Sequence, residues 1–93
     1  MLEVNEYFEG RVKSIALQTA TLPATVGVMA TGEYTFGTSQ KETMSVVSGE
    51  LTVRLLGQDN WQSFGAGASF VVEADQSFDV KVTTETAYFC TYG

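Results

Sequence analysis

Glu42 is the residue of this sequence whose type and position most directly suggest chemistry. It stands at the head of an alternating run and falls on the same side as the apolar Met44 and Val46, because successive side chains of a strand point to opposite faces. A carboxylate on an apolar face is either a solvated strand end or part of a site. A site here requires that the rest of the chain form a pocket around Glu42.

Histidine is absent from the sequence, and Cys90 is the single cysteine. The chain therefore cannot form a Ser-His-Asp triad, use a histidine base, or hold a metal through imidazole ligands. One cysteine also forms no internal disulfide, and without a histidine beside it Cys90 is expected to be an inert buried residue. We expect chemistry without a metal or other cofactor.

The charge distribution excludes several partners. The net charge is −6, and the five cations (Arg11, Lys13, Lys41, Arg54 and Lys81) form no cluster. We therefore expect no nucleic-acid binding and no binding to an anionic membrane. The N-terminus carries acids without a signal pattern, and no apolar run approaches the roughly 20 residues that span a bilayer. These features predict a cytoplasmic protein.

Length and composition indicate one globular domain over residues 1–93. Apolar residues make up 44% of the chain and charged residues only 17%, which is typical of a packed core and excludes disorder. So low a charged fraction suggests that part of the surface is itself an interface. A homodimer is the expected assembly, since two-fold dimers are the commonest oligomers.

The elements that must position Glu42 are short alternating segments separated by glycine-containing turns. Residues 42–55 are expected to form a β-hairpin that turns at Ser48-Gly49-Glu50. Further strands are expected over residues 7–17, 25–30, 33–36, 61–64, 69–72, 78–82 and 87–92. No segment shows a sustained helical period, so the pattern predicts an all-β sandwich or barrel.

Two details of this prediction concern the N-terminal third. In residues 25–30, the alternation leads us to expect Val26 and Val28 to face inward and Gly27 and Met29 outward. Residues 1–6 are expected to be a short lead-in or an edge strand donated to a partner.

The order of these features resembles a cupin, a single-domain double-stranded β-helix or jelly-roll barrel. Glu42, six residues and Gly49 match the end of the first cupin motif, and Gly67 matches the start of the second. Metal-binding cupins carry three histidines in these motifs. The corresponding places here hold Phe36, Thr38 and Phe78, so the resemblance implies a cupin that has lost its imidazole ligands and retains one carboxylate.

A closer resemblance covers essentially the whole chain. The collinear segments are NEYF (5–8), VKS (12–14), VGVM (26–29), GEYTF (32–36), the SG of residues 48–49, Trp61, AG (66–67) and the pattern of Tyr88, Cys90 and Tyr92. This set is similar to the small bacterial cupins of the pyrimidine/purine nucleoside phosphorylase family. The resemblance implies a reaction of purine and pyrimidine nucleosides with phosphate that gives the free base and a pentose 1-phosphate.

The chemistry of that reaction suggests roles for several residues. Its transition state has oxocarbenium character, as in glycoside hydrolysis, so Glu42 is the candidate catalytic residue, either stabilising positive charge on the sugar or holding its hydroxyls. Base stacking is expected from Tyr34, Phe36, Phe78 and Tyr88. Hydroxyls for sugar or phosphate are expected from Thr35, Thr38 and Ser45. Cations for phosphate are expected from Arg11, Lys13 and Arg54.

Each role has a structural alternative. Phe36 and Phe78 suit a plain hydrophobic core, while Lys13 and Arg54 lie among apolar neighbours and suit an interface or snorkelling role. At the level of function, the main alternative is a non-catalytic cupin module that binds a sugar or nucleoside. A further alternative is a purely structural dimer whose barrel is filled by side chains, leaving no cavity beside Glu42.

Overall fold

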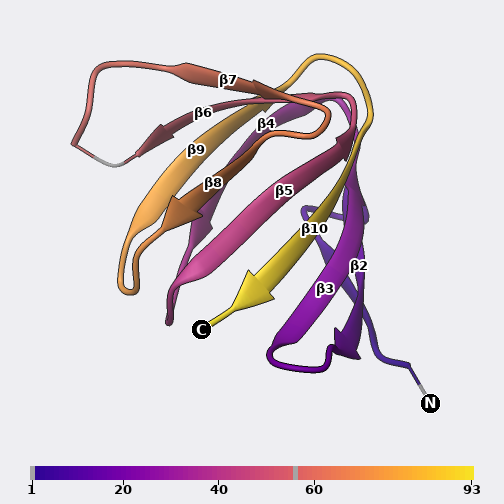
Figure 1. Cartoon of the computed structure of the whole chain (residues 1–93). Helices are drawn as coiled ribbons and strands as arrows, with labels where there is room; N and C mark the ends of the chain where they lie inside the picture. Colours follow the sequence, from indigo (N-terminus) through magenta and orange to yellow (C-terminus); the bar gives the residue numbers. More distant parts are fainter. Residues whose placement is uncertain (1, 56) are drawn as a thin grey trace.

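The computed structural model describes residues 2–55 and 57–93, which form antiparallel strands in two sheets that face one another (Figure 1). The larger sheet has six strands in the order β1 (Val4–Tyr7), β2 (Val12–Gln18), β3 (Pro23–Met29), β10 (Thr86–Tyr92), β5 (Glu42–Ser48) and β8 (Ser69–Val72). The smaller has four in the order β4 (Gly32–Gly37), β9 (Ser77–Val82), β6 (Glu50–Leu55) and β7 (Gln62–Gly65). Among these residues, no helix is long and apolar enough to cross a membrane.

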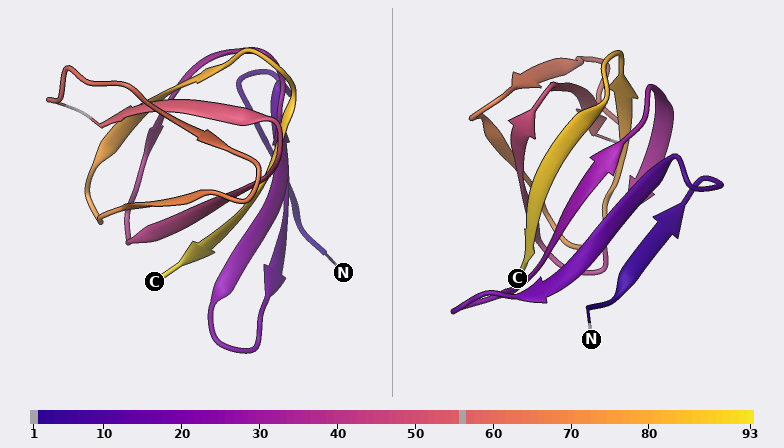
Figure 2. Two further views of the ribbon diagram at one scale, coloured as in Figure 1. Left: turned by 45° about the horizontal axis from the view of Figure 1, so that its top comes forward. Right: turned by 90° about the vertical axis from the view of Figure 1, so that its right-hand side faces the viewer.

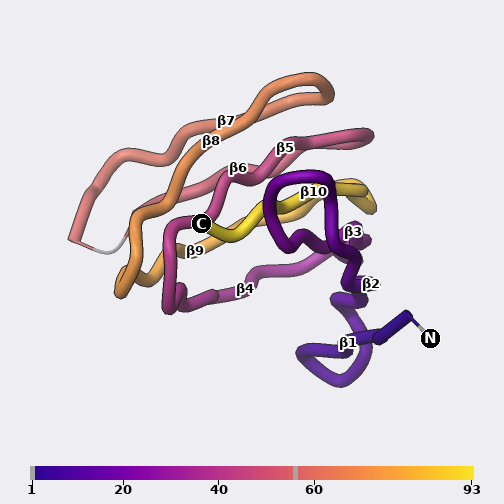
Figure 3. The backbone as a smooth tube through the Cα atoms, turned by 60° about the horizontal axis from the view of Figure 1, so that its bottom comes forward, coloured from indigo at the N-terminus to yellow at the C-terminus, as the bar shows by residue number. Residues whose placement is uncertain are grey.

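The core lies between the sheets, which curve around it as the walls of a barrel (Figure 2). Its buried apolar side chains alternate along each strand, as the sequence predicts for Phe78, Val80 and Val82 on β9 and for Met44 and Val46 on β5. The predicted all-β cupin architecture is therefore confirmed. The view in Figure 3 shows β1 and β2 projecting beside the barrel rather than closing it.

The predicted hairpin over residues 42–55 is wrong, although both of its strands exist. β5 pairs with β10 and β8, whereas β6 pairs with β9 and β7 in the other sheet. The turn at Ser48-Gly49-Glu50 thus carries the chain from one sheet to the other. The prediction failed because alternation and a central glycine are local features, and they occur both in a hairpin and in a turn that connects two sheets.

Gly49 and Thr86 form the corner between the sheets. Gly49 has a φ of +95°, in the left-handed region that favours glycine. The fully buried Thr86 hydroxyl accepts the N–H of Glu50 at 3.1 Å and donates to the carbonyl of Thr84 at 2.7 Å. These bonds satisfy polar groups that the turn would otherwise bury unpaired, and they fix the start of β10 against the end of β5.

The inward face of β3 is opposite to the predicted one. Val26 and Val28 are 46% and 51% exposed, whereas Met29 is 1% exposed and Gly27 is buried. The physical reason is the ring of Tyr88 on β10, which covers Gly27 so closely that a Cβ there would lie 2.6 Å from the Tyr88 Cζ atom. The small residue faces inward because a large neighbour occupies the space.

The N-terminal segment forms an edge strand of the larger sheet of this chain. β1 pairs with β2, with Tyr7 opposite Val12. The connecting turn places Phe8, Glu9 and Gly10 in succession at φ values of 54°, 59° and 85°. Two successive non-glycine residues in that region are uncommon and cost free energy. Contacts of the Phe8 ring with Tyr34 and Phe36, at centroid distances of 4.9 and 5.4 Å, compensate for part of this cost.

The packing of the corner leads to a stability prediction. Alanine at Gly49 would place its Cβ against Thr86 Oγ1 and 2.9 Å from the carbonyl oxygen of Glu85. Gly67 is a matched control, because its φ is +89° and no heavy atom would lie within 4 Å of an added Cβ. We expect Gly67→Ala to cost about 1–2 kcal/mol and Gly49→Ala to cost about 1–3 kcal/mol beyond that, measured by thermal denaturation. Equal losses would contradict the packing described for the corner.

Candidate active site

The barrel contains a cavity of about 180 Å³ beside Glu42. Four of the residues that line it were proposed from the sequence: Phe36, Glu42, Phe78 and Tyr88. They come from β4, β5, β9 and β10, so both sheets contribute. The alternative of a purely structural protein required no cavity at this position, and the cavity speaks against it.

Glu42 is the one carboxylate among the described residues that line this cavity, and it is half-buried. As the first residue of β5, it lies between Tyr92 of β10 and Val72 of β8 in register. Burial raises the pKa of the Glu42 carboxyl above its ordinary value, while a hydrogen bond from the Cys90 thiol, with Sγ 3.6 Å from Oε1, opposes the shift. The carboxyl therefore gains a proton more readily than a solvated glutamate does.

Cys90 and two tyrosines on β10 surround the carboxyl. Burial raises the pKa of the Cys90 thiol to about 12, so it remains protonated and serves as a weak donor to Glu42. Burial likewise raises the pKa of Tyr88 to about 12. The Tyr92 hydroxyl lies 2.9 Å from that of Thr25, and burial raises its pKa as well. The side chains around Glu42 are thus neutral hydroxyls and a thiol at ordinary pH.

Two aromatic rings of the smaller sheet line the same cavity as the carboxyl. Phe36 and Phe78 stack with centroids 5.5 Å apart and planes inclined by 29°. The ring of Phe8 meets Phe36 edge-on at 5.4 Å and supports it from behind. A cavity with a carboxyl at one side and flat apolar rings at another suits a ligand that has a sugar and a planar heterocycle.

The other proposed substrate-binding residues lie elsewhere. Tyr34 is buried, and its hydroxyl donates to the carbonyl of Ala30 at 2.6 Å. Thr38 donates to the carbonyl of Glu73 at 2.7 Å and accepts the N–H of Gln76 at 3.1 Å, so it braces a turn. Thr35 and Ser45 alternate with inward-facing neighbours and belong to the outer faces of the two sheets.

None of the three cations proposed for phosphate lines the cavity. Arg11 lies over the ring of Tyr34 at 5.6 Å. Lys13 is exposed and pairs with Glu6 at 3.5 Å. Arg54 pairs with Asp79 at 2.9 Å on the outer face of the smaller sheet. The Asp79 carboxylate also accepts the hydroxyl of Thr35 at 2.8 Å, and these bonds, that from Arg54 above all, hold the pKa of Asp79 below its usual value.

Six lining residues were not proposed from the sequence: Tyr7, Ser14, Met29, Gly37, Met44 and Tyr92. Alternation puts Ser14 on the same side of residues 12–16 as Val12, but it gives no indication that this side faces a cavity. Tyr7 reaches the cavity from β1, and only the fold of β1 onto β2 brings it there. Alternation puts Tyr92 on the same face of residues 88–92 as Cys90, and this is the sequence signal that could have found it.

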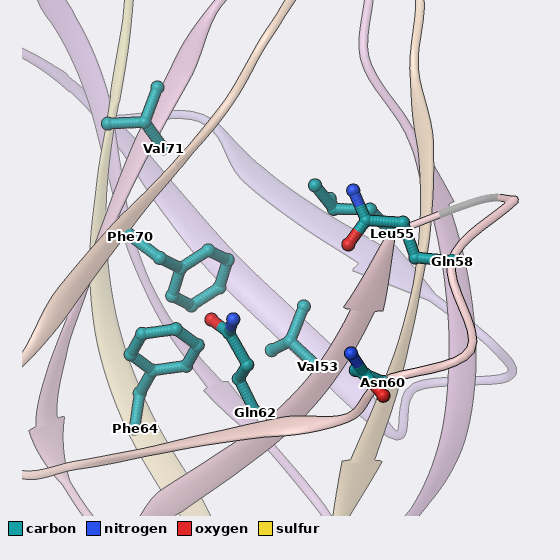
Figure 4. Close-up of a pocket in the computed structure, with 8 residues that line it drawn as sticks. All are labelled: Val53, Leu55, Gln58, Asn60, Gln62, Phe64, Phe70 and Val71. Carbon is teal, nitrogen blue, oxygen red and sulfur yellow. The ribbon is translucent and has the colours of Figure 1, made fainter.

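A second, smaller pocket of about 80 Å³ lies at the open edge between the sheets (Figure 4). Its floor includes Phe64 and Phe70, whose centroids are 4.6 Å apart, and the side chain of Gln62 extends beside them. Among the described residues that line this pocket, none is ionisable. It therefore offers neither an acid nor a base, and the cavity beside Glu42 is the stronger candidate for catalysis.

The residues of the cavity do not fit the metal site of a histidine-bearing cupin. Phe36 and Phe78 offer no ligand atom, and Thr38 is committed to the turn of residues 73–76. Within residues 2–55 and 57–93, no three Asp, Glu, Cys or His side chains are grouped so as to hold an ion. Glu42 alone remains of such a ligand set.

Comparison with known proteins identifies the family. The family model described as pyrimidine/purine nucleoside phosphorylase matches residues 2–92. This chain belongs to that family. A relative with this name from Magnetococcus marinus is 70% identical over 93 residues, covering 100% of both chains. A relative of the same name from Saccharophagus degradans is 70% identical over 92 residues, covering 99% of this chain and 98% of its own.

Solved structures support the same fold. A Vibrio parahaemolyticus protein of unknown function aligns with a TM-score of 0.96 and 43% identity, covering 100% of this chain and 99% of its own. Hydroxypropylphosphonic acid epoxidase from S. wedmorenis aligns with a TM-score of 0.79 at 14% identity, covering 99% of this chain and 55% of its own. At that identity the second likeness concerns the fold alone, and it is to a cupin-like protein.

The burial of Glu42 leads to a pH prediction. Because folding raises the pKa of this carboxyl, its ionisation destabilises the folded state at pH values above the folded pKa. Glu42→Gln removes that cost. We expect Glu42→Gln and the unmodified protein to melt alike near about pH 3.5, below the ordinary glutamate pKa. The variant is expected to melt progressively higher as the pH rises through the ordinary glutamate pKa to the raised pKa of Glu42, and the difference is constant above it. Glu85→Gln removes a charge from an exposed position and controls for net charge. A difference that does not grow with pH would contradict the burial of Glu42.

Proposed function

We propose that this protein is a nucleoside phosphorylase of broad base specificity that works without a metal, with its active site in the cavity beside Glu42. The observation that carries the proposal is that a single partly desolvated carboxyl and two stacked aromatic rings line one cavity. Membership of a family named for this activity supports it. The histidine-free sequence supports chemistry without a metal or other cofactor.

In this reaction an oxygen of phosphate forms a bond to the anomeric carbon of the nucleoside while the bond from that carbon to the base breaks. The electron pair of the broken bond leaves with the base. The base takes up the proton that hydrogen phosphate loses overall, and the sugar becomes a pentose 1-phosphate. Positive charge develops on the sugar ring as the base departs. A Glu42 carboxylate beside the ring stabilises that charge, more effectively in the partly desolvated cavity than in water.

The aromatic wall accounts for broad specificity. Phe36 and Phe78 line the cavity and carry no hydrogen-bonding group. Stacking accepts any base because every base has a π-face, whereas selection of one base requires polar groups matched to its edge. The cavity therefore favours purines and pyrimidines alike, in agreement with the name carried by the relatives.

The proposal predicts phosphate-dependent release of the free base. Purified protein incubated with uridine or inosine is expected to release uracil or hypoxanthine with phosphate present and not without it. Glu42→Gln is expected to lower kcat/KM by about 10²- to 10⁴-fold, with Glu85→Gln as the control of equal charge. Ligand-induced stabilisation without turnover would instead favour a sugar- or nucleoside-binding module. An unchanged rate in Glu42→Gln would remove Glu42 from the mechanism.

We also propose that the protein is a homodimer joined through the outer face of β1, β2 and β3. Val4, Ile15, Val26 and Val28 are all more than 40% exposed and line one apolar groove of about 390 Å³. Contiguous exposed apolar side chains of this kind mark interaction surfaces. A second copy offers the same apolar face, and a two-fold axis brings the two faces together.

The dimer proposal has a direct test. Val28→Glu places a charge in the groove and is expected to give a monomer in sedimentation velocity at a concentration where the unmodified protein is dimeric. Val71→Glu is the matched control, since Val71 is 46% exposed on β8 at the opposite edge of the same sheet. An unmodified protein that sediments as a monomer at about tens of micromolar, or a Val28→Glu variant that stays dimeric, would contradict the proposed interface.

A further inference from the structure

The cavity beside Glu42 leaves the phosphate without a cation. Its lining holds one carboxyl, three tyrosines, a serine, a glycine and apolar side chains. Phosphate carries negative charge at neutral pH, and placing it next to the Glu42 carboxylate is unfavourable unless positive charge or N–H groups lie close by. A phosphorylase of this design therefore needs an anion site at the edge of the cavity.

Four of the five cations of the chain have other environments. Arg11 lies over Tyr34, and Lys13 pairs with Glu6. The remaining two, Arg54 and Lys81, lie over the ring of Trp61 at 4.5 and 4.1 Å on the outer face of the smaller sheet. Lys41 is the fifth cation. It is exposed, and neither ion pair formed within the described ranges involves it.

Lys41 belongs to a loop that begins and ends at the cavity wall. The loop, residues 38–41, connects Gly37 with Glu42, and both of these residues line the cavity. The carbonyl of Lys41 accepts the N–H of Gly93 at 2.7 Å, which holds the loop beside the chain end and next to Tyr92. Figures 1 and 3 both show the connection between β4 and β5 beside the C-terminus.

The same loop has hydrogen-bonding groups that the fold does not use. Thr38 is committed to the turn of residues 73–76 through its hydroxyl, N–H and carbonyl. Ser39 and Gln40 are exposed, and no hydrogen bond found among residues 2–55 and 57–93 uses their backbone N–H groups or the Ser39 hydroxyl. The loop is thus braced at Thr38 and at Lys41 and presents free donors between them.

We propose that the loop of residues 38–41 binds the attacking phosphate at the mouth of the cavity, with Lys41 as its cation and Ser39 and Gln40 as further donors. This proposal rests on the phosphorylase function proposed above. Lysine serves as a point charge for phosphate, and backbone N–H groups add directed hydrogen bonds. A phosphate held there faces the interior along the wall that carries Glu42, so one of its oxygens can meet the anomeric carbon of a sugar bound at that carboxyl.

The experiment compares Lys41→Met with Lys81→Met, which removes the same charge from the outer face. Steady-state kinetics with uridine are expected to show a KM for phosphate raised about tenfold or more in Lys41→Met, with the KM for uridine changed less than about twofold. Lys41→Arg, which restores the charge, is expected to recover most of the phosphate affinity. A phosphate KM unaffected by Lys41→Met, or raised equally by Lys81→Met, would overturn the proposal while leaving the phosphorylase function intact.

A binding measurement separates this proposal from the function on which it rests. Titration with inorganic phosphate alone, followed by ³¹P NMR and by the shift in melting temperature, requires no turnover. Phosphate binding by the unmodified protein that is lost in Lys41→Met and kept in Lys81→Met supports the anion site even if no nucleoside is cleaved. Absence of phosphate binding, or equal binding by both variants, overturns it.

Discussion

The contact between Gly49 and Thr86 is the constraint on which the geometry of the site depends. It lies where β5 ends and β10 begins, and it sends the following strand, β6, into the opposite sheet. The register of β5 with β10 then runs from Ala87 opposite Ser48 to Tyr92 opposite Glu42, with one irregularity next to Ala87. The distance between Glu42 and its neighbours on β10 is therefore set at the far end of the strand pair, by a glycine and a threonine that do not touch the cavity.

The sizes of the side chains on neighbouring strands determine where the barrel is closely packed and where the cavity remains. The absence of a side chain at Gly27 allows the ring of Tyr88 to lie against β3. The ring of Tyr88 then forms part of the cavity wall instead of filling its centre. On the other sheet, Phe36 and Phe78 stack on each other and are supported by Phe8. Rings that support one another along the wall leave the space in front of Glu42 open.

The parts of the fold that the sequence predicted are those that depend on local pattern. Alternation identified most of the strands, the inward row of β9 and the side of β5 on which Glu42 lies. The single strand expected over residues 7–17 was wrong, because the chain turns at residues 8–11 between β1 and β2. The hairpin was wrong because the partner of a strand is a non-local property, and a glycine turn suits both a hairpin and a crossing between sheets. The face of β3 was wrong because Val26 and Val28 are apolar but outward, while the inward position needed the absence of a side chain.

The site was predicted in the same uneven way. Glu42, Phe36, Phe78 and Tyr88 could be proposed because alternation places a carboxyl and aromatic rings on rows that face the barrel interior. The cation that binds phosphate could not be identified from the sequence, because charge alone does not distinguish an arginine that is paired across a sheet from one that is free to bind a ligand. Arg54 shows the difference: Asp79 stands opposite it in the register of β6 and β9, and the guanidinium is already engaged there.

The distribution of charge in the barrel favours binding of the sugar and base in its interior and of the phosphate at its rim. A buried cation next to Glu42 would pair with the carboxyl, hold it ionised and neutralise the charge that faces the sugar. Without one, partial burial raises the pKa of the carboxyl, and none of the described residues that line the cavity is a cation that would neutralise its charge when it is ionised. The carboxylate then acts directly on the positive charge that develops on a bound sugar, in a partly desolvated cavity where this attraction is stronger than in water. An anion site outside this cavity keeps positive charge away from Glu42. A phosphate bound at the rim would be neutralised there by Lys41, and the interior would hold only the sugar and the base.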